Sequence, residues 1–464
     1  MEQSSQSGKH PLDASRSPGS ASRNLLKPQH HPRAVAAAVV VVSVLAAAGC
    51  GSSGSANGGG SGNASSNGKT VITFANWADA EQNTQPGIEK LIKDFEQQNP
   101  NITIKSQAIS YTDVEHQIVL QVQSGNPPDV AEVQGNYTFS INATGALAPL
   151  DSYADGQFKQ SIIPQELQLG NIGGKLTAIP WTVGPFALWY NKKIMQQVGL
   201  TPKAPTTWNE LLSDAMTIHQ KMPKIIAFGT DSTNRTYGLD QNWPIMKSFG
   251  NVPFTGTQAS ADSPGFKDYL NFMRTVAKQG YTPPNKKGGY FRQPAASNQV
   301  AMTIDGPYVK GVVQSTNHMT DQQFYDTWGI APLPAGSAGQ HYSAPTDHQL
   351  VMFKSAKNKD AAWKFMKFLS TSQEGVLNYT LKYENSLPPL QNPAGDVATQ
   401  LNNPISQTFK NDVVPTVTRP DWGPAYGNAY SDVMAGVQSA MTSSTPIDSI
   451  AASIQSALKT DLRG

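Results

Sequence analysis

The chain has 464 residues, with 35 Lys and Arg against 33 Asp and Glu, and a single cysteine. A net charge of +2 excludes a nucleic-acid binder with a basic surface, and a charged fraction of 15% excludes a highly charged disordered chain. One cysteine excludes both an intrachain disulfide framework and a cysteine-rich metal site.

The N-terminal region has the pattern of a secretory signal. Residues 34–48 carry no charge and follow a stretch with several basic residues. As a helix they would reach roughly 22 Å, short of the roughly 30 Å of a bilayer core, so they indicate a signal segment and not a membrane span. Ala47, Ala48 and Gly49 then precede Cys50, and residues 51–68 contain only Gly, Ser, Ala and Asn.

This arrangement resembles a bacterial lipoprotein signal, in which a diacylated cysteine becomes the mature N-terminus. The usual Leu three residues before the cysteine is Ala47 here. The resemblance implies a signal peptide over 1–49, lipidation of Cys50, a flexible tether over 50–68 and an extracytoplasmic protein anchored to the cell membrane. The alternative is an uncleaved anchor with an incidental cysteine.

The next segments alternate between strand and helix patterns. Residues 69–75 are rich in β-formers, and 102–109 and 129–133 read as further strands. Between them, Ile88, Leu91, Ile92 and Phe95 form one apolar helical stripe, and a second helix is expected over 114–122. Strand–helix–strand alternation predicts an α/β fold with a parallel sheet.

The same alternation continues along the chain. We expect strands over 175–180, 185–190 and 299–304, and helices over 207–219, 266–276 and 360–369. No repeat of 20–50 residues is present. A chain of this length with this alternation predicts two lobes.

Catalytic and metal-binding motifs are missing from the sequence. There is no nucleophile elbow, zinc-protease helix or phosphate-binding loop, and the five histidines after the signal are scattered. Asp305 and Asp347 could form a glycosidase carboxylate pair, although a turn explains Asp305 equally well. We therefore expect no enzyme, no metal and no cofactor.

Aromatic residues instead gather at expected strand ends and loops. They are Trp77, Tyr137, Trp181, Trp243, Tyr308, Trp422 and Tyr426. Ligands of open α/β sheets lie beyond the carboxyl ends of strands, and aromatic rings beside Asn, Asp and Gln suit the apolar face and the hydroxyls of a sugar. For each ring taken singly, core packing is an equally good explanation.

Several motifs in a fixed order resemble the bacterial extracellular solute-binding proteins of the maltose-binding type, the receptors of ATP-driven sugar importers. The matching stretches lie at 73–79, 125–133, 145–153, 173–212, 298–308, 357–376 and 386–389. The resemblance implies two lobes, each with a mostly parallel sheet flanked by helices and joined by a hinge. It assigns lobe one to 69–182 plus 349–395 and lobe two to 187–345 plus 400–464.

The resemblance also implies the ligand contacts. They are Trp77, Asp79, Gln134, Asn136, Tyr137, Trp181, Gly184, Asp305, Tyr308, Trp422 and Tyr426. Gly184 replaces a glutamate of the maltose-binding branch, and Asp347 and His348 are further candidates. Asp79 and Asp305 would accept charge-assisted bonds from sugar hydroxyls, or else cap a helix and form a turn.

The sequence therefore predicts a monomeric sugar or oligosaccharide receptor that closes on its ligand and delivers it to membrane permease subunits. A secreted glycan-active enzyme is one alternative. The other is the same fold binding a polyamine, an amino acid or another small solute. Aromatic residues that come with Asn and Gln and only two candidate carboxylates favour a neutral sugar.

Overall fold

The computed structural model describes residues 68–111, 113–337, 339–421 and 426–462. The signal segment, Cys50, the tether up to residue 67 and Trp422 lie outside these residues. Within the described ranges, no helix combines the length and apolar character needed to cross a membrane.

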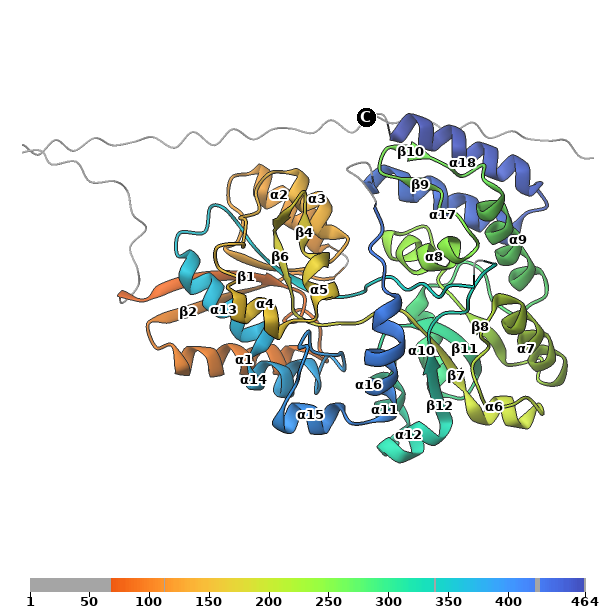
Figure 1. The fold of residues 1–464 in the computed structure, drawn as a ribbon, viewed down its shortest axis with the longest axis horizontal. Helices are drawn as coiled ribbons and strands as arrows, with labels where there is room; N and C mark the ends of the chain where they lie inside the picture. The colour runs from red at the N-terminus through yellow and green to blue at the C-terminus, as the bar shows by residue number, and fades with distance from the viewer. Residues whose placement is uncertain (1–67, 112, 338, 422–425, 463–464) are drawn as a thin grey trace, which may run out of the picture. The chain divides into compact units, whose positions relative to one another are not determined.

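The first sheet has five strands in the order β2-β1-β3-β13-β6 (Figure 1). They are β1 (Thr70–Asn76), β2 (Ile102–Ala108), β3 (Val130–Gln134), β6 (Ala178–Pro180) and β13 (His348–Met352). β1 pairs in parallel with β2 and β3, whereas β13 pairs antiparallel with β3 and β6. Strands far apart in the sequence therefore meet in one sheet.

Helices cover both faces of this sheet because alternate side chains of its strands point to opposite faces. On one face, Phe74 of β1 packs between Phe365 and Trp181, beside the helices α1 (Gln85–Gln98) and α13 (Lys359–Thr371). The predicted stripe on α1 is the side that this helix buries. On the other face lie α2 (Val114–Gln123) and α3 (Tyr137–Ala143). Short helices follow at α4 (Gly156–Ser161), α5 (Pro164–Leu169) and α14 (Gln373–Gly375).

The second sheet has four strands in the order β12-β7-β11-β8 (Figure 1). They are β7 (Ala187–Asn191), β8 (Ile226–Gly229), β11 (Val300–Asp305) and β12 (Trp328–Ala331). β7 is antiparallel to both β11 and β12, and β11 is parallel to β8.

Two hydrophobic clusters enclose the second sheet. One joins it to α7 (Trp208–Lys221), α8 (Thr236–Ser248), α9 (Pro264–Lys278), α17 (Tyr426–Thr442) and α18 (Ile447–Asp461). The other joins it to α10 (Arg292–Ala296), α11 (Val309–Asn317), α12 (Asp321–Thr327), α15 (Gly395–Leu401) and α16 (Pro404–Thr408). The helix α6 (Lys192–Gln197) follows β7 directly.

The expectation of mostly parallel sheets is wrong, because both sheets are mixed. The strands that the chain enters from the other sheet, β7 and β13, both run antiparallel to their neighbours. A crossover connection such as a helix sets two strands of the same sheet parallel. β7 and β13 instead enter their sheets directly from the other half, through residues 181–186 and 343–347, so no such unit sets their direction on entry.

Three extended segments pass between the two sheets and lie side by side. Val183 bridges Leu387, and Pro185 bridges Pro345. The segments thus come from residues 181–186, from the approach to β13 and from the stretch before α15. These crossings join the two α/β halves of the folded region.

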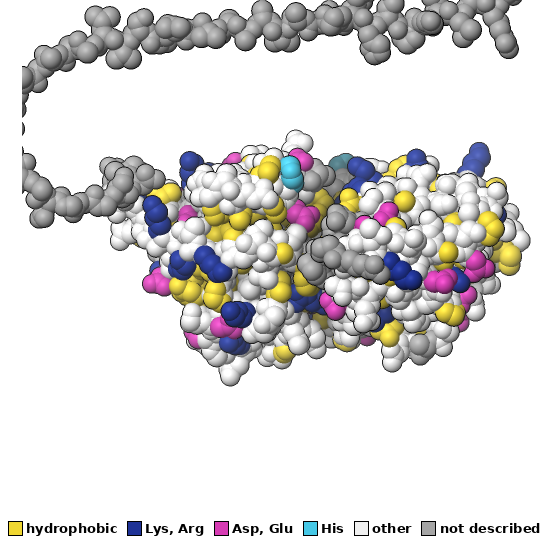
Figure 2. All heavy atoms as spheres, turned by 90° about the horizontal axis from the view of Figure 1, so that it is seen from above, with side chains coloured by type: hydrophobic (Ala, Val, Ile, Leu, Met, Phe, Trp, Pro, Cys, Tyr) yellow, Lys and Arg dark blue, Asp and Glu magenta, His cyan; other side chains and the backbone are white. Residues whose placement is uncertain are grey.

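Acidic and basic side chains are interspersed over the face seen in Figure 2, with no large area of one sign. This face therefore offers no charged patch that would recruit a highly charged partner.

Candidate functional site

A cleft of about 550 Å³ lies where the crossings meet the strand ends of both sheets. Its walls include Trp77, Glu81, Asn83, Tyr111, Gln134, Tyr237, Arg292, Tyr308, Thr346, His348, Tyr383, Glu384 and Asn385. The volume falls in the usual range for small-molecule sites, about 300–1,000 Å³. Aromatic rings, amides and charged groups therefore share one concave surface.

The wall formed by the first sheet depends on Glu132 of β3, whose side chain is fully buried. One carboxylate oxygen accepts the backbone N–H groups of Trp77 and Ala78, at 3.0 and 3.2 Å. The other lies 2.9 Å from Nδ1 of His348. Glu132 thus fixes both the loop after β1 and the first side chain of β13, and it stands directly behind the cleft.

His348 lies between two carboxylates, because Glu384 approaches its Nε2 at 3.4 Å. Burial lowers the pKa of His348, but Glu384 and Glu132 outweigh burial and raise the pKa to about 9. The ring is therefore an imidazolium at neutral pH. Trp77 packs edge-on against it, with ring centroids 4.7 Å apart.

The wall formed by the second sheet contains Arg292 and two tyrosines. Arg292 binds Asp305 through two N–H groups, at 2.9 and 3.2 Å, and its guanidinium lies 4.4 Å from the ring centre of Tyr308. The hydroxyls of Tyr308 and Tyr237 are 3.0 Å apart. Burial and the Asp305 carboxylate raise the pKa of Tyr308 to about 12, so its phenol stays neutral.

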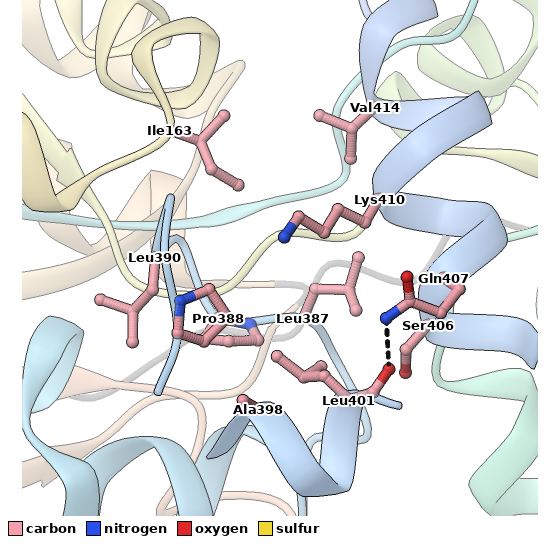
Figure 3. A pocket seen from close by; sticks show the side chains of 11 residues that line it. Ile163, Leu387, Pro388, Leu390, Ala398, Leu401, Ser406, Gln407, Lys410 and Val414 are labelled. Carbon is pink, nitrogen blue, oxygen red and sulfur yellow. Dashed lines mark hydrogen bonds between the residues drawn. The ribbon is translucent and has the colours of Figure 1, made fainter. Parts of the chain in front are cut away.

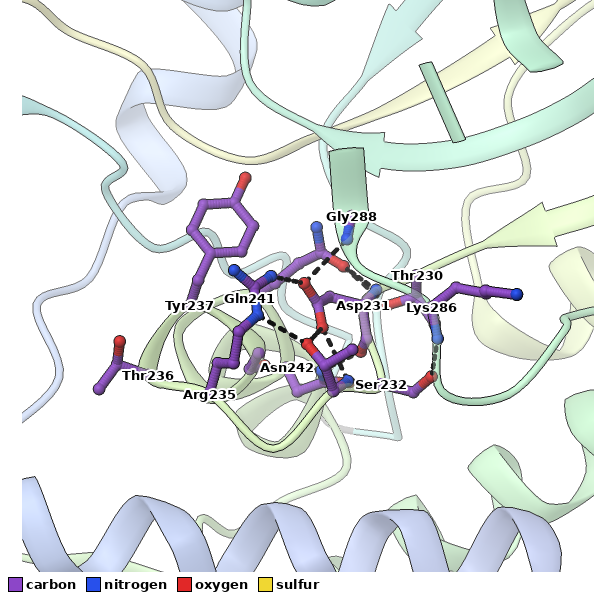
Figure 4. A network of polar contacts seen from close by, with 12 residues as sticks. Thr230, Asp231, Ser232, Arg235, Thr236, Tyr237, Gln241, Asn242, Lys286 and Gly288 are labelled. Atoms are coloured by element: carbon purple, nitrogen blue, oxygen red, sulfur yellow. Dashed lines mark hydrogen bonds and ion pairs between the residues drawn. The ribbon is translucent and has the colours of Figure 1, made fainter. Parts of the chain in front are cut away.

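A buried carboxylate also orders the loops behind this wall (Figure 4). Asp231 accepts bonds from the N–H groups of Thr233 and Gly288 and pairs with Arg235, each at 2.8 Å. It therefore connects the loop that leads to Tyr237 with the 3-10 turn that leads to Arg292.

Three of the expected ligand contacts line the cleft: Trp77, Gln134 and Tyr308. The hydroxyl of Tyr111 donates a hydrogen bond to the side-chain oxygen of Gln134. Tyr137 is buried behind Tyr111, with ring centroids 6.3 Å apart, and does not reach the cleft surface.

Trp181 is not a cleft residue. Its ring is fully buried in the core of the first sheet, stacked on Tyr379 at 4.8 Å. The backbone N–H of Trp181 bonds to the carbonyl of His348 and their rings lie 6.5 Å apart, but Phe74 and Tyr379 pack against Trp181 while His348 lines the cleft. Asp79 also lies outside the cleft lining, where it accepts a hydrogen bond from Ser106 at 2.7 Å.

Asn136 and Tyr426 contact each other and do not line the cleft. The Asn136 amide donates to Asp240 at 2.6 Å, and the Tyr426 hydroxyl donates to the other Asp240 oxygen at 2.9 Å. Asn136 precedes α3 of the first half, whereas Asp240 and Tyr426 belong to α8 and α17 of the second. These buried groups form a polar contact between the halves.

Gly184 and Asp305 have structural roles behind the cleft. A Cβ on Gly184 would lie 3.1 Å from the Thr346 hydroxyl, so a larger residue would push Thr346, which lines the cleft. Asp305 is buried and forms an ion pair with Arg292.

A second pair of carboxyl groups lies at the crossings. Asp347 accepts the Gly184 N–H at 2.7 Å and neighbours Glu166 of α5, and both are buried. Burial and the Asp347 carboxylate raise the pKa of Glu166 well above its usual range, and burial raises that of Asp347 to about 6. The raised pKa favours the protonated form of Glu166, which allows two acidic groups to share a dry site.

A smaller cavity of about 130 Å³ lies beside the third crossing (Figure 3). Ile163, Leu387, Leu390 and Leu401 make it mostly apolar, and Lys410 extends toward it. It is smaller than a typical ligand site. In the described part of the chain, no three His, Cys, Asp or Glu side chains group to hold a metal ion.

Other cleft residues escaped the sequence reasoning. Glu81, Tyr111 and Glu384 lie between elements, and Tyr237 and Arg292 lie in the first turns of α8 and α10. None of them belongs to a recognisable motif. Glu132 stands in an apolar strand, where a single buried carboxylate was a signal of function.

Comparisons with known proteins agree with this architecture. A model of the family described as bacterial extracellular solute-binding protein matches residues 78–376. The maltotriose-binding protein of Pyrococcus abyssi is 23% identical over 361 residues, 74% of this chain and 71% of that protein.

Two solved structures share the fold. A solute-binding protein of Thermotoga lettingae bound to α-D-tagatose has a TM-score of 0.72 and 21% identity, over 85% of this chain and 100% of the other. UgpB of Mycobacterium tuberculosis with glycerophosphocholine has a TM-score of 0.73 and 18% identity, over 85% and 99%. These likenesses confirm the predicted two-lobe α/β class.

The Glu132–His348 pair gives a pH-dependent prediction. Glu132→Gln should lower the free energy of unfolding by about 1.5–3 kcal/mol near pH 6.5, the scale of hydrogen bonds to charged groups. His348 has a raised pKa in the folded state, so its stabilisation is complete below about pH 6.5 and lost as pH rises toward 9. The deficit of the variant should shrink over that range in denaturant melts.

Glu166→Gln is the matched control, because it changes another fully buried glutamate. Burial and the Asp347 carboxylate raise the pKa of Glu166, so its ionised form costs stability above the unfolded pKa. Burial also raises the pKa of Glu132, but that carboxylate has the His348 imidazolium and two backbone N–H groups as partners. The control should be as stable as the wild type at pH 7, or more stable. A Glu132→Gln deficit that is absent, or that grows toward pH 9, would contradict the role assigned to Glu132.

Proposed function

Because the chain belongs to the bacterial extracellular solute-binding proteins, we propose that it is the substrate-binding receptor of an ATP-driven (ABC) importer. Its ligand is a neutral sugar or an oligosaccharide, held in the cleft between the two lobes. The sugar ligands named for the Pyrococcus and Thermotoga relatives support this choice.

The observation that carries the proposal is the composition of the cleft. Tyr111, Tyr237 and Tyr308 are partly exposed and supply aromatic faces for the apolar side of a sugar ring. Trp77 also lines the cleft but is mostly covered by Tyr111 and His348. Gln134 and Asn385 supply amides that both donate and accept hydrogen bonds, as hydroxyl groups require. The cationic side chains Arg292 and His348 are already paired with carboxylates, so they suit a neutral ligand.

The mechanism follows from the fact that the two walls of the cleft belong to different halves of the protein. Residues of both halves line the same cleft, so a ligand that contacts both stabilises the closed arrangement of lobe one (69–182 plus 349–395) and lobe two (187–345 plus 400–464). The closed receptor, a monomer without catalysis of its own, then docks on the permease subunits.

One observation favours a second candidate ligand. Among the described residues, Glu81 has no side-chain hydrogen bond or ion pair, and it lines the cleft together with Glu384. Burial and the nearby Glu384 raise the pKa of Glu81. A cationic group beside these carboxylates and Trp77 would be stabilised, as in an amino sugar or a choline ester like the UgpB ligand.

We further propose that Cys50 is lipidated and anchors the protein outside the cytoplasmic membrane. The uncharged segment 34–48, the small residues before Cys50 and the tether after it support this placement.

Tyr308 provides the test of sugar binding. The purified protein is first titrated calorimetrically against monosaccharides, oligosaccharides, glucosamine and glycerophosphocholine. Tyr308→Ala should then weaken binding of the best sugar by about 1–3 kcal/mol, because the ring that stacks on the ligand is lost. Tyr308→Phe keeps the ring and should weaken binding much less; it loses the hydroxyl contact with Tyr237, which should lower the free energy of unfolding by about 0.5–1.5 kcal/mol.

Trp181→Phe is the control for core packing. It should lower the stability of the ligand-free protein and leave sugar affinity unchanged, since Trp181 does not line the cleft. Binding of no sugar, or equal affinity of Tyr308→Ala and wild type, would contradict the proposed sugar site. Selective binding of glucosamine or glycerophosphocholine would favour the second candidate.

Anchoring is tested at Cys50 in a bacterial host. Cys50→Ala should remove the acyl groups and leave the protein either uncleaved or released from the membrane, because the thioether link and the cleavage site both require the cysteine. Ser52→Ala, a neighbouring substitution in the tether, should remain lipidated. Membrane fractionation with intact-mass measurement decides the matter: equal retention and equal processing of wild type and Cys50→Ala would refute lipidation.

A further inference from the structure

A second chamber of about 510 Å³, with both polar and apolar side chains in its lining, adjoins the cleft. Asn385, in the stretch that leads to the third crossing, lines both cavities. The second chamber is also large enough to be a small-molecule site.

The lining of the chamber resembles that of a sugar site. It supplies amides and hydroxyls from Asn385, Ser386, Thr399, Gln400, Asn402 and Asn403, together with the ring of Tyr325. Its charged groups are balanced internally, because Lys310 lies 2.9 Å from both Asp321 and the Tyr325 hydroxyl. A neutral ligand rich in hydroxyl groups therefore matches the chamber better than an ion does.

The boundary between the two cavities is one side chain thick at Asn385. This residue has a φ of 52°, in the left-handed region, and its amide packs on Gly311 of α11. A Cβ on Gly311 would lie 2.5 Å from the amide nitrogen of Asn385, so only glycine admits this contact. The Asn385 amide donates to the Tyr383 carbonyl at 3.2 Å, while its oxygen has no hydrogen-bond partner among the described residues. The boundary thus presents a free acceptor.

We propose that the second chamber is an additional sugar subsite, so that the ligand is an oligosaccharide that extends from the cleft past Asn385. This inference rests on the proposed function of the cleft. It adds a binding place for the far end of the oligosaccharide. Residues 399–403 would then determine which ligand length binds best.

The test fills the second chamber and leaves the cleft intact. Asn402→Trp and Thr399→Trp each place a large ring at an exposed position of the chamber lining. Asn101→Trp, at an exposed turn outside both cavities, is the matched control. Calorimetric titrations use sugar ladders of one to six units in α-1,4, β-1,4 and α-1,6 linkages.

For the ladder that binds, affinity of the wild type should rise with length until both cavities are filled. Each chamber variant should lose tenfold or more in affinity for the long members and stay within twofold for the shortest member that binds. The control should match the wild type throughout. Two variants at different positions protect the test against a local folding defect.

Affinity that does not depend on length, or an equal loss for short and long members in both chamber variants, would overturn the second subsite while the sugar site of the cleft stands. Binding of no ladder would contradict the proposed function itself, and the second subsite would be rejected with it.

Discussion

The interaction on which the binding surface depends most is the burial of the Glu132 carboxylate behind the cleft. A buried carboxylate is costly unless it is paired and hydrogen-bonded, and Glu132 has two backbone N–H partners and the His348 imidazolium. The same bonds hold Trp77 and His348 at the cleft. The position of the aromatic wall is therefore tied to the satisfaction of one charge, and not to the packing of the rings alone.

The opposite wall is built on the same principle, with different groups. Asp305 forms an ion pair with Arg292, and Arg292 in turn lies over the ring of Tyr308. Asp231 fixes the loops from which Tyr237 and Arg292 extend. In each half, buried carboxylates behind the surface set the orientation of the side chains in front. Such rigid walls reduce the entropy that a ligand would otherwise have to overcome on binding. Movement is then left to the three crossings between the halves.

The sequence predicted the elements whose pattern is local and missed the contacts that tertiary packing decides. The stripe of Ile88, Leu91 and Phe95 predicted a helix that buries this side, and Tyr308 after Asp305-Gly306-Pro307 was correctly expected at a strand end. Trp181 also follows a strand, yet it is buried because Phe74 and Tyr379, which come from other elements, pack against its ring. Asn136 and Tyr426, 290 positions apart, meet only because α3 and α17 come together. No local pattern carries that information.

The central claim is that one ligand contacts both halves through the cleft, and solution scattering tests it most directly. The radius of gyration of the purified protein would be measured without ligand and at a saturating concentration of the sugar that binds best in calorimetry. The account predicts a smaller radius with ligand, since contacts to Trp77 on one side and Tyr308 on the other favour the closed arrangement. An unchanged scattering profile under demonstrated saturation would contradict it, and would place the ligand in a rigid pocket of a single half.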